Sequence, residues 1–232
     1  MYEYDIRVGY HQTDENKILT IPALIDLFQD CSTFQSEDLG IGVDYCRENG
    51  FFWVINNWQV EITSLPQLCD RITVFTFPYE FKGFVGKRCF GIKLNGETIV
   101  KAASVWSLLS TETYLPVRTN ELMHEKYVLE EPLEMGPFKR KIPVPEGGEK
   151  MLPITIQNVH LDANHHVNNG KYVAMGASFL PEDVKIKEIR VGYLSQAFLG
   201  DVIYPRLVKT EDGYIVSLED KDGKPYAVME FK

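Results

Sequence analysis

Hydrophobic residues recur at helical spacing in the segment that follows Thr20. They lie at positions i, i+3, i+4, i+7 and i+10, and they are Ile21, Leu24, Ile25, Phe28 and Cys31. This spacing places them on one face of a helix. Thr20 is a suitable N-cap, and a proline is tolerated in the first turn. The pattern therefore predicts a helix from about Thr20 to Glu37.

Alternating apolar and polar residues predict strands on both sides of this helix. The N-terminal residues alternate in this way, and so do residues 54–62, 72–77, 88–94 and 98–109. The last two segments flank Asn95-Gly96, a dipeptide typical of a two-residue hairpin turn. The first part of the chain is therefore expected to be a strand, a helix and then an antiparallel meander.

The same order returns after a stretch that is rich in proline. The periodic pattern breaks down between about Arg118 and Lys150. This stretch contains several prolines, Gly147-Gly148 and the basic run Lys139-Arg140-Lys141, a composition typical of a linker that crosses the surface. Beyond it we expect a short strand over 154–159 and a helix that is capped by Asn169 and ended by Pro181. Four more strands are expected over 184–194, 202–209, 214–219 and 226–231.

The two halves of the chain therefore look like a weak internal duplication. Asn95-Gly96-Glu97 in the first half corresponds to Asp222-Gly223-Lys224 in the second. We expect an α+β fold with two domains, residues 1–130 and 151–232, joined by a linker at 131–150. Each domain would be an antiparallel sheet wrapped around one central helix.

Composition and charge restrict the function classes. The chain has 232 residues, of which 44% are hydrophobic and 25% charged, as in ordinary globular proteins. The net charge of -9 argues against general nucleic-acid binding, which needs many cationic contacts to phosphates. No apolar run approaches the length of a membrane-spanning helix, and no signal peptide is evident, which favours a cytoplasmic location without a membrane partner.

The cysteines give little functional information. Cys31, Cys46, Cys69 and Cys89 form no C-x-x-C motif and have no zinc-finger spacing to histidine. We therefore expect reduced, buried thiols.

The most unusual polar cluster is the run from His160 to Asn169, between a predicted strand and a predicted helix. It contains Asp162, Asn164 and His166. Free backbone N–H groups and the helix dipole converge at a helix N-terminus, where they favour anionic or polarised groups. An oxyanion derived from a carbonyl substrate can be stabilised at such a place.

Three interpretations of this cluster remain open from the residues alone. The first is helix capping, for which asparagine and aspartate are common. The second is a metal site with His160, Asp162, His165 and His166 as ligands, although no H-E-x-x-H motif or cysteine set supports it. The third is an acid/base or water-activating site at His166, held by a neighbouring carboxylate or amide.

The run Asp162-Ala-Asn164-His-His166-Val-Asn-Asn-Gly-Lys-Tyr172 resembles the D-x-N-x-H-V-N-N-x-x-Y signature of acyl-acyl carrier protein (acyl-ACP) thioesterases. The resemblance extends over almost the whole chain, and the lack of a plastid transit peptide points to the bacterial branch. Residues similar to those of the family also occur in the first half, at Trp53-Val54, Pro66, Asp70, Gly86, Arg88 and Ala103-x-x-Trp106.

The resemblance implies two tandem hotdog domains in one chain. The N-terminal hotdog would shape the acyl pocket, and the C-terminal hotdog would carry the catalytic residues. The implied reaction is hydrolysis of the thioester between a fatty acyl chain and the phosphopantetheine arm of the carrier protein, which ends fatty-acid synthesis and needs no cofactor or metal. Candidates for the pocket wall, each equally suited to plain core, are Phe28, Phe34, Phe51, Phe52 and Trp53.

Carried over residue by residue, Asp162, Asn164 and His166 take the catalytic positions. A fourth position falls on Gln196, where the family usually has glutamate. Gln196 cannot be a general base, but its amide can orient a water or bind the thioester carbonyl. Ala197 stands where plant members have cysteine, so a nucleophilic thiol at that position is excluded.

The expected mechanism is therefore direct attack by water. His166 and Asp162 are the candidates for activating or orienting that water. Asn164, or the backbone N–H groups near Val167 and Asn168, would stabilise the oxyanion.

The implied partner is an acidic acyl carrier protein, whose docking needs a local positive surface. Candidates are Lys139-Arg140-Lys141 in the linker and Lys185, Lys187 and Arg190 in the second half. We expect a monomer or homodimer. Two alternatives are another hotdog enzyme, such as an acyl-CoA thioesterase or a dehydratase, which the motif disfavours, and a non-catalytic acyl-binding protein, which Gln196 favours.

Overall fold

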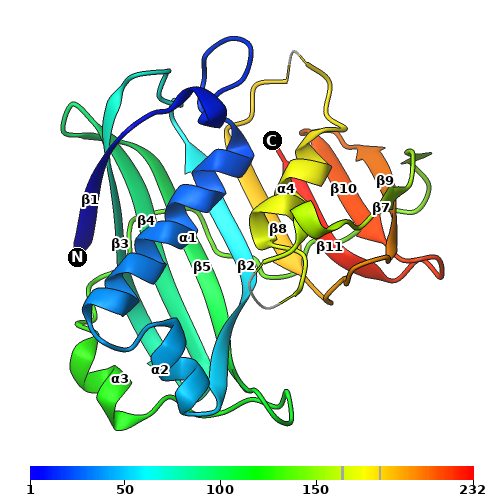
Figure 1. Cartoon of the computed structure of the whole chain (residues 1–232). Helices are drawn as coiled ribbons and strands as arrows, with labels where there is room; N and C mark the ends of the chain where they lie inside the picture. Colours follow the sequence, from blue (N-terminus) through cyan, green and yellow to red (C-terminus); the bar gives the residue numbers. More distant parts are fainter. Residues whose placement is uncertain (163–164, 183) are drawn as a thin grey trace. The chain divides into compact units, whose positions relative to one another are not determined.

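The computed structural model describes residues 1–162, 165–182 and 184–232, and the chain divides into two compact units (Figure 1). Unit 1 consists of Met1–Asn56 and Val60–Phe138, and unit 2 consists of Asn57–Gln59 and Lys139–Lys232. The change from unit 1 to unit 2 after Phe138 falls inside the stretch 131–150 that has the composition of a linker.

Unit 1 is a sheet with one long helix, α1 (Ile21–Asp38), lying across it (Figure 1). The strand order is β1-β3-β4-β5-β2, and the pairs β1–β3, β3–β4 and β4–β5 are antiparallel. The strands are β1 (Tyr2–Arg7), β2 (Phe51–Ile62), β3 (Arg71–Lys82), β4 (Val85–Leu94) and β5 (Glu97–Ser110). Three short helices complete the unit, namely η1 (Tyr10–Gln12), α2 (Val43–Glu48) and α3 (Glu121–Lys126).

Local sequence signals determine where these elements begin and turn. The Thr20 hydroxyl accepts a hydrogen bond from the Ala23 N–H at 3.3 Å, so the predicted cap of α1 is confirmed. Its buried face includes the five apolar residues at helical spacing. Asn95 and Gly96 have φ angles of 54° and 85° and join β4 to β5, as the dipeptide predicts.

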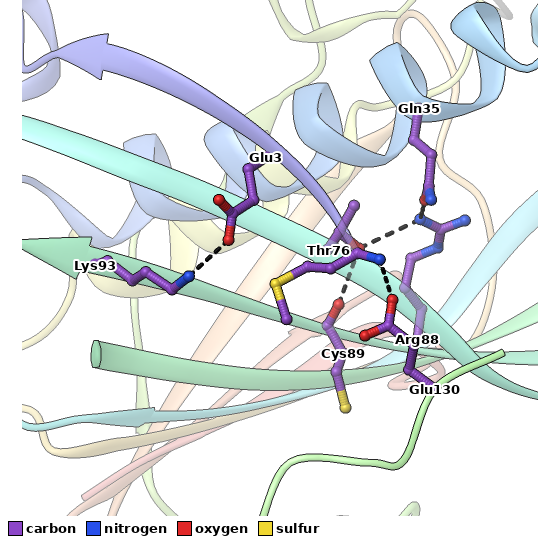
Figure 2. A network of polar contacts seen from close by, with 8 residues as sticks. Glu3, Gln35, Thr76, Arg88, Cys89, Lys93 and Glu130 are labelled. Atoms are coloured by element: carbon purple, nitrogen blue, oxygen red, sulfur yellow. Dashed lines mark hydrogen bonds and ion pairs between the residues drawn. The ribbon is translucent and has the colours of Figure 1, made fainter. Parts of the chain in front are cut away.

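The interior of unit 1 contains a buried arginine. The Arg88 guanidinium donates through Nη1 to Gln35 Oε1 of α1 and, at 3.3 Å, to Thr76 Oγ1 of β3 (Figure 2). The guanidinium also lies 5.2 Å from the centre of the Tyr127 ring, a cation–π contact. Burial lowers the pKa of Arg88, because the charged form loses its hydration. Neutral hydrogen-bond acceptors therefore hold this cation between helix and sheet.

The expectation of irregular chain beyond residue 118 is wrong at helix α3. The Asn120 side chain caps this helix by accepting from the Met123 N–H at 3.0 Å. Met123 is fully buried in a cluster with Ile41, Cys46, Leu108 and Tyr127. A helix of six residues is too short for a periodic pattern, and this packing is what stabilises it.

Unit 2 repeats the arrangement with a shorter helix, α4 (Asn169–Ala177), against an antiparallel sheet (Figure 1). The strand order is β8-β11-β10-β9-β6, and β7 pairs with β9. The strands are β6 (Glu149–Lys150), β7 (Ile154–Thr155), β8 (Glu188–Tyr193), β9 (Val202–Lys209), β10 (Tyr214–Glu219) and β11 (Pro225–Phe231). Each unit is thus a sheet with one principal helix, which confirms the predicted double hotdog.

The two faces of the unit 2 sheet have different covers. Helix α4 packs closely on one face, because a Cβ atom at Gly176 would lie only 2.5 Å from Met229 Sδ. Ile142 packs on Val228, which is next to Met229 in strand β11. Successive side chains of a strand point to opposite faces, so the segment around Ile142 covers the face opposite to α4.

Two predicted strands of unit 2 are shorter than expected. The strand predicted over 154–159 ends at Thr155, and residues 158–160 form the 3-10 helix η2 (Asn158–His160). The strand predicted over 184–194 is β8, which begins at Glu188.

Among the described residues, no helix has the length and apolar character needed to cross a membrane.

Asn168, and not Asn169 as predicted, is the N-cap of α4. Its Oδ1 accepts from the Gly170 N–H at 2.8 Å. Asn168→Ala is expected to lower the free energy of unfolding by about 1 kcal/mol, because the capping acceptor is lost. Asn168→Asp keeps an acceptor at the helix N-terminus and should leave stability nearly unchanged. Urea denaturation measures the free energy of unfolding of both variants. If Asn168→Ala is as stable as Asn168→Asp, the capping role is contradicted.

Candidate functional site

The described residues of the polar motif, 162 and 165–168, are joined by hydrogen bonds in a loop that precedes α4 in unit 2. The Asp162 N–H donates to the His166 carbonyl at 2.8 Å, and the His166 N–H donates to Asp162 Oδ1 at 3.3 Å. Between them, His165 has a positive φ of 62°. These bonds hold Asp162 and His166 next to each other across the loop. The predicted site residue Asn164 lies outside the described residues.

The segment that follows β8 brings Gln196 to this loop. The Ala197 carbonyl accepts from the Val167 N–H at 3.1 Å, and the Ala197 N–H donates to the Tyr172 hydroxyl at 2.8 Å. Burial raises the pKa of Tyr172, so this hydroxyl stays protonated. Gln196 is partly buried and adjacent to Ala197. Asp162, His166 and Gln196 therefore belong to one region of unit 2.

Phe198 is a residue of this region that the sequence did not single out. Its ring lies edge-on to the His166 imidazole, with 5.1 Å between the ring centres and 77° between the ring planes. Phe198 is 49% exposed, and its N–H donates to Asp201 Oδ2 at 2.8 Å. Its position two residues after Gln196 is the only signal that marks it in the sequence. The contact restricts the orientation of the imidazole.

The expectation that backbone N–H groups of Val167 and Asn168 stabilise an oxyanion is wrong. The Val167 N–H already donates to Ala197, and the Asn168 N–H donates to the His160 carbonyl at 2.9 Å. The next turn is engaged as well, because Gly170 donates to Asn168 Oδ1. Side-chain amides are therefore better candidates than these N–H groups for contacting a substrate carbonyl.

The histidines of the motif have separate environments. His160 Nδ1 accepts from the Gln157 N–H at 3.0 Å within η2, whereas His165 is exposed. In the described part of the chain, no three His, Cys, Asp or Glu side chains gather as metal ligands would. This geometry favours a local structural role for His160.

One of the basic docking candidates is wrong. Arg190 is only 7% exposed, and its Nη1 forms an ion pair with Glu230 at 2.6 Å. It is therefore not available to a partner. Lys185, Lys187 and the run Lys139-Arg140-Lys141 are exposed.

The aromatic candidates for an acyl pocket do not form one wall. Phe28 is fully buried against Phe90, while Phe51 and Trp53 join the cluster around Leu108. Phe34 is 42% exposed on α1, and Phe52 contacts Tyr114 at the surface. These positions assign Phe28 and Phe51 to the core of unit 1.

The sequence is similar to those of known acyl-ACP thioesterases. The family model described as acyl-ACP thioesterase N-terminal domain matches residues 1–127. The chloroplastic oleoyl-acyl carrier protein thioesterase 2 of Arabidopsis thaliana is 24% identical over 225 residues, which cover 87% of this chain and 61% of that protein. This chain thus spans less than two thirds of the length of that relative.

Solved structures show the same fold. An acyl-ACP thioesterase from Bacteroides thetaiotaomicron has a TM-score of 0.90 and 19% identity, with 99% of this chain and 96% of that chain covered. The 12:0-ACP thioesterase from Umbellularia californica has a TM-score of 0.89 and 15% identity, with 100% and 96% covered. At these identities the similarity establishes the fold.

The match to the family model includes most of unit 1 and more than half of the chain, residues 1–127 of 232. The run from Asp162 to Tyr172, which lies in unit 2 and outside this match, resembles the D-x-N-x-H-V-N-N-x-x-Y signature of the same family. The chain belongs to the acyl-ACP thioesterase family.

Proposed function

We propose that this protein hydrolyses the thioester of fatty acyl-ACP and releases the free fatty acid. The observation that carries the proposal is the motif loop at the start of α4, which holds Asp162 beside His166 and is bonded to the segment that contains Gln196. A polar loop of this kind at a helix N-terminus, in a chain of this family, suits attack on a polarised carbonyl.

In the proposed reaction, water attacks the thioester carbonyl carbon directly. The His166 imidazole accepts a proton from the attacking water, and the resulting imidazolium donates that proton to the sulfur as the carbon–sulfur bond breaks and the thiol leaves. Asp162 orients or assists His166. Since the N–H groups of Val167 and Asn168 have acceptors within the fold, the side-chain amides of Asn164 and Gln196 are assigned to the carbonyl oxygen.

The proposed catalytic role of Asp162 can be tested separately from its structural role in the loop. Asp162→Asn keeps an Oδ1 acceptor for the His166 N–H but removes the carboxylate charge, so the loop should persist while kcat falls at least about tenfold. Gln196→Glu restores the usual family residue and serves as the matched variant. If Gln196→Glu raises kcat and Asp162→Asn leaves it unchanged, the assignment of Asp162 is wrong.

The assay is the release of free thiol from a panel of acyl-ACP and acyl-CoA thioesters. The expectation of buried thiols is wrong for Cys69, which is exposed, whereas burial raises the pKa of Cys46 and Cys89 to about 11. A Cys69→Ser background therefore lowers the thiol signal of the protein itself. Hydrolysis confined to acyl-CoA would favour a different hotdog enzyme. Binding of acyl-ACP without thiol release would favour the acyl-binding protein that Gln196 suggests.

A further inference from the structure

Residues 139–144, here called the basic strap, are held to the sheet of unit 2 through their backbone. Arg190 Nη2 donates to the carbonyl oxygens of Lys139 and Lys141 at 2.6 and 2.9 Å. Asn57 Nδ2 donates to the Arg140 carbonyl at 2.9 Å. Three successive carbonyls are thus anchored, while the side chains of the same three residues are exposed.

A pocket of about 260 Å³ lies between the basic strap and the sheet. Its apolar lining comes from Ile142, Pro143 and Val144 of the strap and from Gly192, Leu194 and Val228 of the sheet side, and the exposed Arg140 and Lys141 also line it. Gly192 contributes to this space because it has no side chain. A Cβ atom there would have ordinary contacts, 3.4 Å from Asn57 Nδ2 and 4.0 Å from the Arg140 carbonyl oxygen.

The charge of the basic strap is opposite to that of the whole chain. The chain carries a net charge of -9, but residues 139–145 contain three cations and no acidic residue. The nearby carboxylate of Glu230 is neutralised by its ion pair with Arg190. An acidic protein is therefore attracted to this surface and repelled by the net negative charge of the chain as a whole. The anchored backbone also reduces the ordering cost of binding.

We propose that the basic strap and its pocket are the docking surface for the acidic carrier protein. Carboxylates of the carrier contact Lys139, Arg140 and Lys141, and one apolar side chain of the carrier enters the pocket. This inference rests on the proposed function, because the carrier delivers the acyl chain. Leu194 in the pocket lies two residues before Gln196, so docking places the carrier at the end of β8 that leads into the site.

The first test is reversal of the strap charges in the full-length chain. The triple variant Lys139→Glu, Arg140→Glu, Lys141→Glu keeps the backbone anchors. For acyl-ACP at low salt, we expect KM to rise about tenfold or more with kcat unchanged. The effect should shrink at high salt, because screening weakens contacts between exposed charges. The KM for a small acyl-N-acetylcysteamine thioester, which lacks the carrier and its phosphate, should not change.

A matched control separates local docking from net charge. The variant Lys82→Glu, Lys126→Glu, Lys221→Glu changes three other exposed lysines and produces the same charge, since three changes of -2 take -9 to -15. It should leave KM for acyl-ACP within about twofold. Gly192→Ala tests the pocket and should raise KM by about two- to fivefold in a manner that salt does not relieve.

Four outcomes decide the proposal. An unchanged KM for acyl-ACP in the strap variant would overturn it, and so would an equal rise in the control variant. A parallel rise for the small thioester would also overturn it, because the strap would then act through the active site. If no thioester is hydrolysed, the proposed function fails, whereas strap-dependent binding of acyl-ACP, measured by calorimetry, would still support the docking surface.

Discussion

Replacing His166 with alanine is expected to lower kcat for acyl-ACP hydrolysis by about 10²- to 10⁴-fold, the usual contribution of a positioned general base. The reason is geometric. The imidazole lies against the Phe198 ring, and the backbone N–H of the same residue donates to Asp162 Oδ1. The alanine variant keeps the backbone N–H that donates to Asp162, so the loop should remain folded. Thiol release gives kcat, and thermal unfolding followed by circular dichroism checks the fold.

His165→Asn is the matched control for this experiment. His165 is exposed and has a positive φ, a conformation that asparagine tolerates well. Its kcat should stay within about twofold of the wild type, because this side chain has no assigned part in the proposed reaction. A His166→Ala variant that keeps the wild-type kcat would show that another group activates the water.

Replacing Gln35 with leucine is expected to lower the free energy of unfolding by about 2–3 kcal/mol, because a buried guanidinium loses a charge-assisted hydrogen bond. Gln35 Oε1 accepts from Arg88 Nη1, and both residues are buried (Figure 2). Leucine is similar in size to glutamine, so the loss should come from the missing acceptor and not from a cavity. Urea denaturation followed by circular dichroism measures the change.

Gln35→Glu distinguishes the missing hydrogen bond from a general effect of substitution. Its carboxylate supplies an acceptor to the same guanidinium, so this variant should recover most of the stability that leucine loses. If the leucine variant is as stable as the wild type, the other contacts of Arg88, to Thr76 and the Tyr127 ring, are sufficient to hold the cation.

The elements that were predicted correctly depend on signals within a few residues. The Thr20 cap, the apolar spacing of α1 and the Asn95-Gly96 turn all act locally. Helix α3 was missed because its six residues have no clear period, and its stability comes from burial of Met123 among distant residues. Local pattern therefore predicts long elements, and packing decides the short ones.

The chemistry of the site shows the same division. The sequence motif named Asp162 and His166, and the structure places them side by side through backbone hydrogen bonds. The sequence also suggested Val167 and Asn168 as oxyanion donors, but their N–H groups are occupied. The acceptor of the Val167 N–H is the Ala197 carbonyl, 30 residues further along the chain. No local sequence pattern can show such a bond.

By itself the sequence determined the face of α1, the Asn95-Gly96 hairpin turn, the repeated order of strands and helix, and the residues of the motif. Those properties follow from short-range periodicity, turn chemistry and residue types. Only the tertiary structure decided which charges are available, because Arg190 meets Glu230 through the register of β8 with β11. Arg190, predicted as a docking residue, is therefore an internal anchor that donates to the carbonyls of Lys139 and Lys141. The side chains of Lys139, Arg140 and Lys141 remain exposed to solvent.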